Sequence, residues 1–163
     1  MSGSAAATRN LRNLRWLWLS AAVIGLDQLS KMIASRMLDL HQPVPVMPFL
    51  NLTLTHNTGA AFSFLSDAGG WQRWFFAGLT IVVAIIIVVW LTRLTAGLRW
   101  LAAALSLVLG GALGNLWDRL VIGAVVDFID VYYGTWHWPA FNVADSAICV
   151  GAVMLVVSTL KEG

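Results

Sequence analysis

Charged residues are scarce in this sequence. Only 11% of its 163 residues are Asp, Glu, Lys or Arg, whereas 59% are hydrophobic, and soluble domains carry roughly a quarter charged residues. The longest polar interval, about 36–71, is itself half apolar and too short to bury a core of its own. The composition therefore excludes an ordinary water-soluble protein, and we expect a single membrane domain over residues 1–163.

The sequence also lacks a second cysteine, a metal-binding motif and a basic stripe, and each absence excludes one kind of bond, site or partner. The only cysteine, Cys149, excludes an intramolecular disulfide. The three histidines, His41, His56 and His137, have no ligand spacing and no His-Glu-x-x-His motif occurs, so we expect neither a metal nor a cofactor. The ten basic residues are scattered instead of forming a stripe that could follow phosphates, which argues against nucleic acid as a partner.

Long apolar runs dominate what remains. Each of four runs approaches the roughly 20 residues that an α-helix needs to cross a bilayer. The small residues Gly110 and Gly114 are spaced by four within one of them, which favours close helix packing. We expect four transmembrane helices at about 14–35, 72–92, 98–117 and 140–160, with an uncleaved first helix.

The basic residues indicate how these helices cross the membrane. Cytoplasmic connections carry an excess of Lys and Arg. One side collects six of them, namely Arg9, Arg12, Arg15, Arg93, Arg99 and Lys161, and the other side collects Arg36, Arg73 and Arg119. We therefore expect both termini in the cytoplasm and the two longer connections outside.

The two outer connections have their own patterns. Apolar residues alternate with polar ones over 50–55, and Phe62 and Phe64 alternate again after 56–59, which predicts a β-hairpin. The connection at about 118–139 is rich in Tyr and Trp, and we expect part of it to form a short interfacial helix. The predicted fold is thus a mainly α membrane protein with four spanning helices, a small extracytoplasmic β-hairpin or sheet cradle and this interfacial helix.

Ionisable residues within spans are costly unless they are paired or face a cavity. Asp27 and Lys31 lie four residues apart on one face of the first span, which suits an ion pair that is either structural or orders a neighbouring site. Asn115, Asp118 and Arg119 share one face at the outer end of the third span. One interpretation is that these residues form a hydrogen-bonded network. The other is that the Arg119 side chain only extends to the lipid headgroups.

Two more carboxylates are expected at the same outer depth. Asp127 follows two valines, and Asp145 follows Asn142 by three residues at the start of the fourth span. Two carboxylates brought together would share one proton and could add water to an amide carbonyl, as in aspartic proteases. The alternative is that both merely cap helix ends.

Five motifs in their order along the chain resemble the lipoprotein signal peptidases, also called signal peptidase II. They are residues 27–31 (DQLSK), 57–62 (NTGAAF), 110–119 (GGALGNLWDR), 126–128 (VDF) and 141–146 (FNVADS). Each motif is weak alone, but the order and the positions relative to four spans make the resemblance specific, and it covers nearly the whole chain.

The resemblance implies that Asp127 and Asp145 are the catalytic dyad. It also implies that a set of residues orders the site or holds the substrate: Asp27, Lys31, Asn57, Gly59, Asn115, Arg119 and Asn142. The expected substrate is a prolipoprotein whose cysteine carries diacylglycerol, cut just before that cysteine. The resemblance further implies a bacterial cytoplasmic membrane, membrane lipid as surroundings, inhibition by globomycin and no metal, and we expect a monomer.

Two other interpretations remain open at this point. Intramembrane Asp, Lys and Arg also serve transporters and proton relays. Here, however, these residues cluster toward one face of the membrane and do not form a chain of polar groups across the bilayer. Paired charges could also belong to a non-catalytic scaffold in which they only fix helix packing.

Overall fold

A computed structural model describes residues 11–59, 70–95 and 97–162. A 3-10 helix, η1 (Leu11–Trp16), leads into α1 (Leu17–Met37), and three more long helices follow: α2 (Trp71–Arg93), α3 (Arg99–Val121) and α4 (Val143–Glu162). All four α-helices are long and apolar enough to cross a membrane. The four predicted spans are therefore confirmed, with ends that differ from the expected ones by a few residues.

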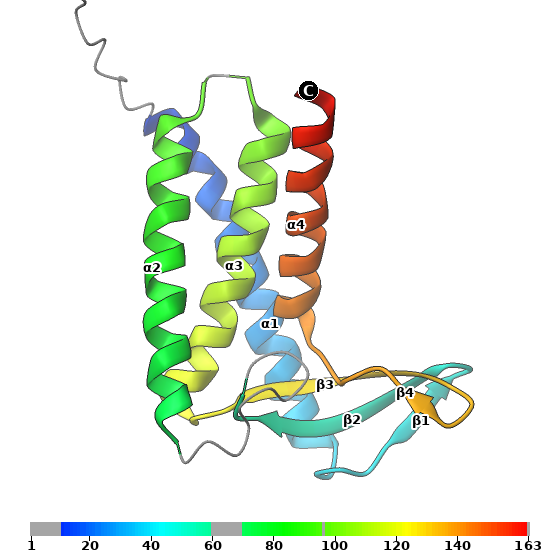
Figure 1. The fold of residues 1–163 in the computed structure, drawn as a ribbon. Coiled ribbons are helices and arrows are strands. Elements are labelled where there is room, and N and C mark those ends of the chain that lie inside the picture. The colour runs from blue at the N-terminus through cyan, green and yellow to red at the C-terminus, as the bar shows by residue number, and fades with distance from the viewer. Residues whose placement is uncertain (1–10, 60–69, 96, 163) are drawn as a thin grey trace, which may run out of the picture.

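Helix α3 lies at the centre of the bundle and packs against the other three helices (Figure 1). Its small residues explain how closely its neighbours approach. A Cβ atom on Gly110 would lie within 2.9 Å of the Ser20 backbone in α1, and one on Gly111 would collide with the Ala144 carbonyl of α4. The predicted close packing through these glycines is thus confirmed, and it brings α1 and α4 together around α3.

The remaining helix surface is apolar and exposed. Trp18, Ile85 and Val153 are 62%, 59% and 63% exposed, respectively, and water would solvate such side chains poorly. A buried cluster between α2 and α3, formed by Ile87, Leu91, Leu94, Ala102, Leu105 and Leu109, supplies the apolar core near one end. The exposed apolar surface fits contact with lipid chains.

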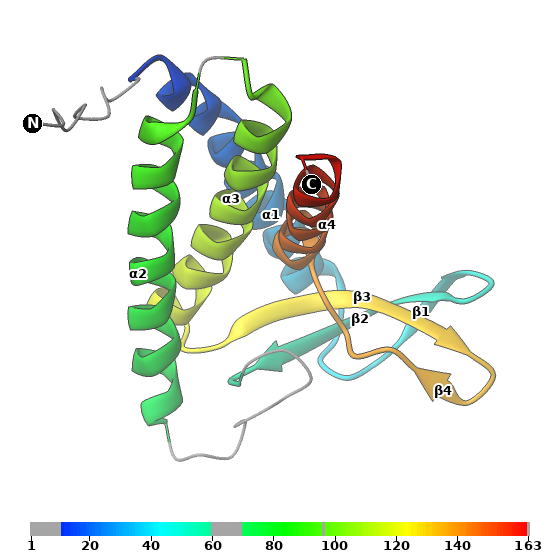
Figure 2. The same cartoon turned by 45° about the horizontal axis from the view of Figure 1, so that its top comes forward.

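A small antiparallel sheet lies across one end of the bundle and extends beyond α4 (Figures 1 and 2). Its order is β1 (Val44–Met47), β2 (Leu50–Asn57), β3 (Val125–Tyr133) and β4 (Trp136–His137). Strands β2 and β3 come from the two different outer connections, so their pairing joins segments far apart in the sequence.

Two expectations for the outer connections need correction. No interfacial helix forms between α3 and α4: residues 125–133 (VVDFIDVYY) are strand β3, because β-branched and aromatic residues favour a sheet. Residues 50–57 do form the predicted strand, but it pairs with β1 and β3. The expected second hairpin strand, with Phe62 and Phe64, lies outside the described residues.

Candidate active site

The sheet end of the bundle gathers the polar residues that the sequence singles out. Carboxylates from three different elements frame it: α1 carries Asp27, β3 carries Asp127 and the first turn of α4 carries Asp145, and α3 adds Asp118 behind them. All three are linked to amide or amine groups of α1, α3 and β2 by hydrogen bonds or ion pairs. The site is therefore assembled from segments that are far apart in the sequence, and it forms only when the chain folds.

Asn142 joins Asp127 to Asp145. Its fully buried side chain donates from Nδ2 to Asp127 Oδ1 over 2.7 Å and accepts at Oδ1 from the Asp145 backbone N–H over 2.8 Å. In return, Asp145 Oδ2 accepts from the Asn142 backbone N–H over 3.2 Å. This reciprocal pair is a capping box at the start of α4, so Asp145 caps its helix and still lies beside Asp127.

The other oxygens of the two carboxylates are held by amides. Asn57 Nδ2 donates to Asp127 Oδ2 over 3.3 Å, and Asn115 Nδ2 donates to Asp145 Oδ1 over 2.8 Å. Amides hold a carboxylate in place without neutralising its charge. The geometry thus fixes both groups while leaving each able to gain or lose a proton.

The protonation of Asp127 follows from its surroundings. Burial, and then the nearby charge of Asp145, raise the pKa of Asp127 from its ordinary 3.8 to about 7, while the hydrogen bonds from Asn57 and Asn142 and the charge of Lys31 oppose the rise. A carboxyl group with such a pKa exchanges a proton near neutral pH. Asp127 is therefore suited to acid–base chemistry.

Lys31 lies at the centre of a buried ionic cluster behind the two carboxylates. Its Nζ atom is 2.8 Å from Asp27 Oδ2, 2.7 Å from Asp118 Oδ2 and 2.9 Å from Asn115 Oδ1. The predicted Asp27–Lys31 ion pair is confirmed. Because Asn115 also contacts Asp145, the ion pair is connected to the site as well as to the helix packing.

Asp27 also fixes the start of α4. Its Oδ1 atom accepts from the Ala144 backbone N–H over 2.9 Å, one of the donors that a helix N-terminus leaves unpaired. A Cβ on Gly114 would come within 2.7 Å of Asp27 Oδ2. The absence of a side chain at Gly114 therefore allows the carboxylate to reach between α3 and α4.

Arg119 points toward the sheet. Its Nη2 atom donates to the Gly59 carbonyl over 3.0 Å, and its guanidinium lies 5.4 Å from the centre of the Phe76 ring. Gly59 in turn donates its N–H to Asn57 Oδ1 over 3.0 Å. Of the two alternatives for Arg119, the network is the one observed, and it connects α3 to the end of β2 beside Asp127.

One polar group of the site was not foreseen from the sequence. Gln28 Nε2 donates to Asp118 Oδ1 over 2.9 Å and contacts Asp27 Oδ2 at 3.2 Å. Asp118 also accepts from the Val126 N–H over 3.2 Å, which holds the start of β3 one residue before Asp127. The signal that could have identified Gln28 is an amide side chain next to Asp27 within a span.

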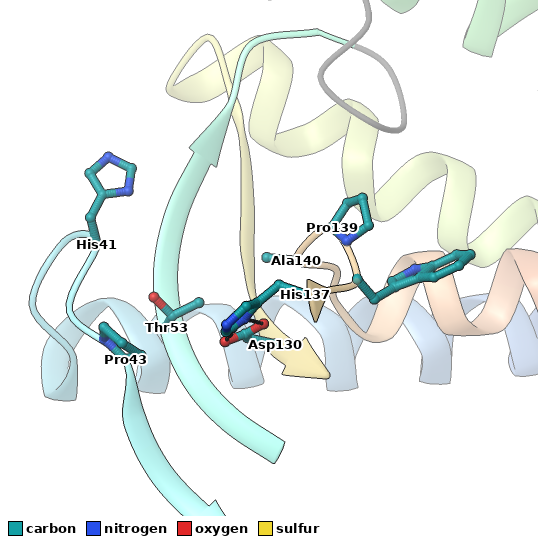
Figure 3. A pocket seen from close by; sticks show the side chains of 8 residues that line it. His41, Pro43, Thr53, Asp130, His137, Pro139 and Ala140 are labelled. Carbon is teal, nitrogen blue, oxygen red and sulfur yellow. Dashed lines mark hydrogen bonds and ion pairs between the residues drawn. The ribbon is translucent and has the colours of Figure 1, made fainter. Parts of the chain in front are cut away.

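A second polar cluster lies farther along the sheet, at a cleft of about 500 Å³. There Asp130 contacts His137 Nδ1 at 2.8 Å and accepts from Asn51 Nδ2 over 2.9 Å. Figure 3 shows His137 against Asp130, with His41 pointing away from them. Within the described part of the chain, no group of three or more His, Cys, Asp or Glu side chains could hold a metal ion.

Comparisons with known proteins agree with the fold and the motifs. The model of the family described as signal peptidase (SPase) II matches residues 19–161. The chain is 58% identical to a lipoprotein signal peptidase of Acinetobacter baumannii, over 90% of this chain and 84% of that protein. It is 52% identical to one from Pseudomonas syringae pv. tomato, over 99% and 95% of the two chains.

Solved structures extend the similarity to three dimensions. A bacterial membrane enzyme solved at 2.3 Å by the in meso method has a TM-score of 0.83 and 31% identity, over 96% of this chain and 93% of that chain. A second such structure, at 1.9 Å, has a TM-score of 0.81 and the same identity, over 96% and 99% of the two chains. Helices and sheet are therefore arranged as in a known membrane enzyme.

Proposed function

Because the chain belongs to the signal peptidase II family, we propose that it is an aspartic endopeptidase that removes the signal peptide from prolipoproteins. It cuts just before the cysteine that carries diacylglycerol. The observation that carries this proposal is the pairing of Asp127 and Asp145 through Asn142. Both carboxylates lie where the helices meet the sheet, at the end of a membrane-spanning bundle.

The chemistry requires one proton on the pair. Because burial, and then the charge of Asp145, raise the pKa of Asp127, one carboxyl is protonated while the other is ionised, as in other carboxylate dyads. The ionised carboxylate takes a proton from water, whose oxygen adds to the scissile carbonyl carbon, while the protonated partner gives its proton to the carbonyl oxygen. The dyad has thereby exchanged its acid and base roles.

Collapse of the tetrahedral intermediate completes the cut. The carbon–nitrogen bond breaks, the amide nitrogen receives the proton taken from water, and the gem-diol returns its other proton to the dyad as the new carboxyl group forms. The products are a signal peptide with a free carboxyl terminus and a lipoprotein with a free amino group on its lipidated cysteine. No group of the enzyme is consumed.

The surrounding residues order this pair and hold the substrate. Lys31 and Asn115 fix Asp145 from the helix side, through the 2.9 Å contact between them and the Asn115 bond to Asp145. Arg119 and Asn57 hold Gly59 beside β2, where an extended substrate backbone passes the dyad. A signal peptide is itself a membrane helix, so its scissile bond reaches this depth without leaving the bilayer.

The membrane arrangement follows the same proposal. Both termini lie in the cytoplasm, the sheet lies outside, and one chain over 1–163 acts as a single-domain monomer in the cytoplasmic membrane of a bacterium. Membrane lipid surrounds the helices, and globomycin inhibits the cut. The basic residues at the end of the bundle opposite the sheet, such as Arg15 and Arg99, support this orientation.

The test is cleavage of a purified prolipoprotein by the chain in detergent, with the new amino terminus read by mass spectrometry. Substrate with a diacylglyceryl cysteine is expected to yield a product that begins at that cysteine. The same substrate without the lipid, and the natural substrate with globomycin, serve as controls and are expected to remain uncut. Cleavage elsewhere, or equal cleavage without the lipid, would refute the proposed specificity.

A further inference from the structure

The end of the bundle opposite the sheet carries a concentration of positive charge. Seven of the eight acidic residues lie between positions 27 and 145 of the sequence, and the eighth is Glu162 near the C-terminus. The described basic side chains at this end belong to Arg12, Arg15, Arg93 and Arg99. Basic residues at this end therefore outnumber the acidic ones.

Two of these arginines share a cleft. It measures about 370 Å³ and is lined by Arg15 and Trp16 of η1, Trp18 of α1 and Arg99 at the start of α3. The two arginines come from segments that are distant in sequence but adjacent at this end of the fold. Both are exposed, and neither guanidinium makes an ion pair or hydrogen bond with any residue in the described ranges.

Two guanidinium groups facing one cleft repel each other, and the repulsion is stronger at a membrane surface than in bulk water. Arg side chains bind phosphate oxygens through paired N–H donors. The two tryptophans beside them are the residue type that lies at the headgroup level of a bilayer. Charge, donor geometry and depth together fit a phosphodiester with fatty acyl chains attached.

We propose that this cleft binds the headgroup of an anionic phospholipid of the phosphatidylglycerol class. Arg15 and Arg99 donate to the phosphate, while the rings of Trp16 and Trp18 pack beside the glycerol backbone. The bound lipid joins η1 to the start of α3 at the end of the bundle far from the dyad. This inference does not depend on the peptidase activity, because it rests only on the residues at this end.

The experiment is native mass spectrometry of the purified full chain in detergent, titrated separately with phosphatidylglycerol and with phosphatidylcholine. The natural chain is expected to bind phosphatidylglycerol preferentially, with one lipid retained at the lowest concentrations. Each basic residue near a membrane surface contributes about 1 kcal/mol to anionic lipid binding. Arg15→Gln and Arg99→Gln should therefore each weaken binding about 5-fold, and the double variant about 30-fold.

Arg93→Gln is the matched control, because Arg93 lies at the same end and is exposed but does not line the cleft. It should leave phosphatidylglycerol binding within 2-fold or so of the natural value. Equal binding of the two lipids by the natural chain would overturn the proposal. So would a loss in Arg93→Gln as large as in the double variant, because net charge alone would then explain the effect.

A second measurement does not depend on the arginine variants. Brominated phosphatidylglycerol should quench the tryptophan fluorescence of the natural chain more strongly than brominated phosphatidylcholine does. The double change Trp16→Phe with Trp18→Phe should remove most of that difference, whereas Trp136→Phe, a change in strand β4 on the sheet, should preserve it. Equal quenching by the two lipids, or a difference that survives the double change unaltered, would contradict a lipid at this cleft.

Discussion

Strand β3 carries two buried carboxylates whose surroundings differ. Asp127 is 3% exposed and Asp130 is 5% exposed, and their spacing of three places them on opposite faces of the strand. Asp130 has a partner that can carry positive charge, since His137 Nδ1 lies 2.8 Å away, together with the amide of Asn51. Asp127 is held by the amides of Asn57 and Asn142, and it lies beside a second carboxylate.

The different partners indicate different roles: Asp130 holds the sheet together, whereas Asp127 can exchange a proton. Asp130 links β2, β3 and β4 through Asn51 and His137. Between it and Asp127, β2 has a register irregularity, as Leu52 pairs with Ile129 and Thr55 with Asp127. Irregularities of this kind change the direction of side chains beside active sites. Burial is thus common to both groups, and the partners determine the role.

Replacing each carboxylate by its amide should separate the roles of Asp127 and Asp130 most clearly. Asp127→Asn removes a proton-exchanging group, and we expect the cleavage rate to fall about 100- to 10,000-fold, the usual contribution of a positioned acid or base. Asp130→Asn is the matched control and should keep the rate within about tenfold. The rates are measured on diacylglyceryl-modified prolipoprotein with both variants at equal folded concentration. Similar losses in the two variants would mean that the two carboxylates have the same role.

Asn142→Ala should affect both the activity and the stability. The change removes the bond to Asp127 and the acceptor for the Asp145 N–H, and loss of a helix N-cap costs about 1 kcal/mol. We expect a lower thermal midpoint and a cleavage rate reduced at least about tenfold. Ser146→Ala, which loses one hydroxyl bond to the Asn142 carbonyl, is the nearby control and should change the rate little.

The pH dependence should distinguish Asp127 by its proton. Because its pKa is raised to about 7, the pair keeps a proton below that pH, and kcat/KM should fall as the pH rises above it. The folded state also binds more protons than the unfolded state between the ordinary pKa of 3.8 and about 7. The free energy of unfolding should therefore decrease as the pH rises through this window.

The same pH series on two variants checks the assignment. Asp127→Asn should make the decrease in stability between pH 4 and 7 or so shallower, because the Asp127 carboxyl no longer contributes to it, whereas Asp130→Asn should leave both the decrease and the alkaline fall of kcat/KM in place. An alkaline limb that moves in Asp130→Asn would show that the Asp130 group controls the proton of the dyad.

A substitution at Asp130 is expected to lower the stability of the fold. Asp130→Leu leaves the Asn51 amide and His137 without their partner, and an unpaired buried polar group costs about 1–3 kcal/mol. The double change Asn51→Leu with Asp130→Leu should recover part of that loss, because both partners are then apolar. Thermal unfolding in detergent measures the two variants. Additive losses would contradict direct coupling between Asn51 and Asp130.

The sequence was informative where the membrane imposes the pattern. Spans follow from apolar length, and Asp27, Lys31 and Asn115 were identifiable because polar groups are rare within spans. The Asp27–Lys31 pair could be predicted because helical spacing places them on one face. The roles assigned to Asp127 and Asp145 stay predictions, although the fold brings the two residues to the same amide.

The sheet was harder to predict, because its pairing is non-local. Strand β2 pairs with β3 across a long stretch of the chain, as in the Asn51 bond to Asp130 at a separation of 79, and no local pattern reports such a partner. The aromatic residues near 132–138 fit an interface as well as a strand. For the same reason no local pattern indicated that Asp130 and His137 would meet.

A kinetic cycle over Asp127 and Asp145 would show whether the two carboxylates act as one catalytic pair. Cleavage of diacylglyceryl-modified prolipoprotein would be measured for the natural chain, Asp127→Asn, Asp145→Asn and the double variant, at matched folding. When two groups act as a unit, the effects of replacing them on the rate are not additive. The double variant should therefore be about as slow as either single variant. Losses that multiply in the double variant, or a single variant that cleaves at the natural rate, would contradict a shared catalytic pair.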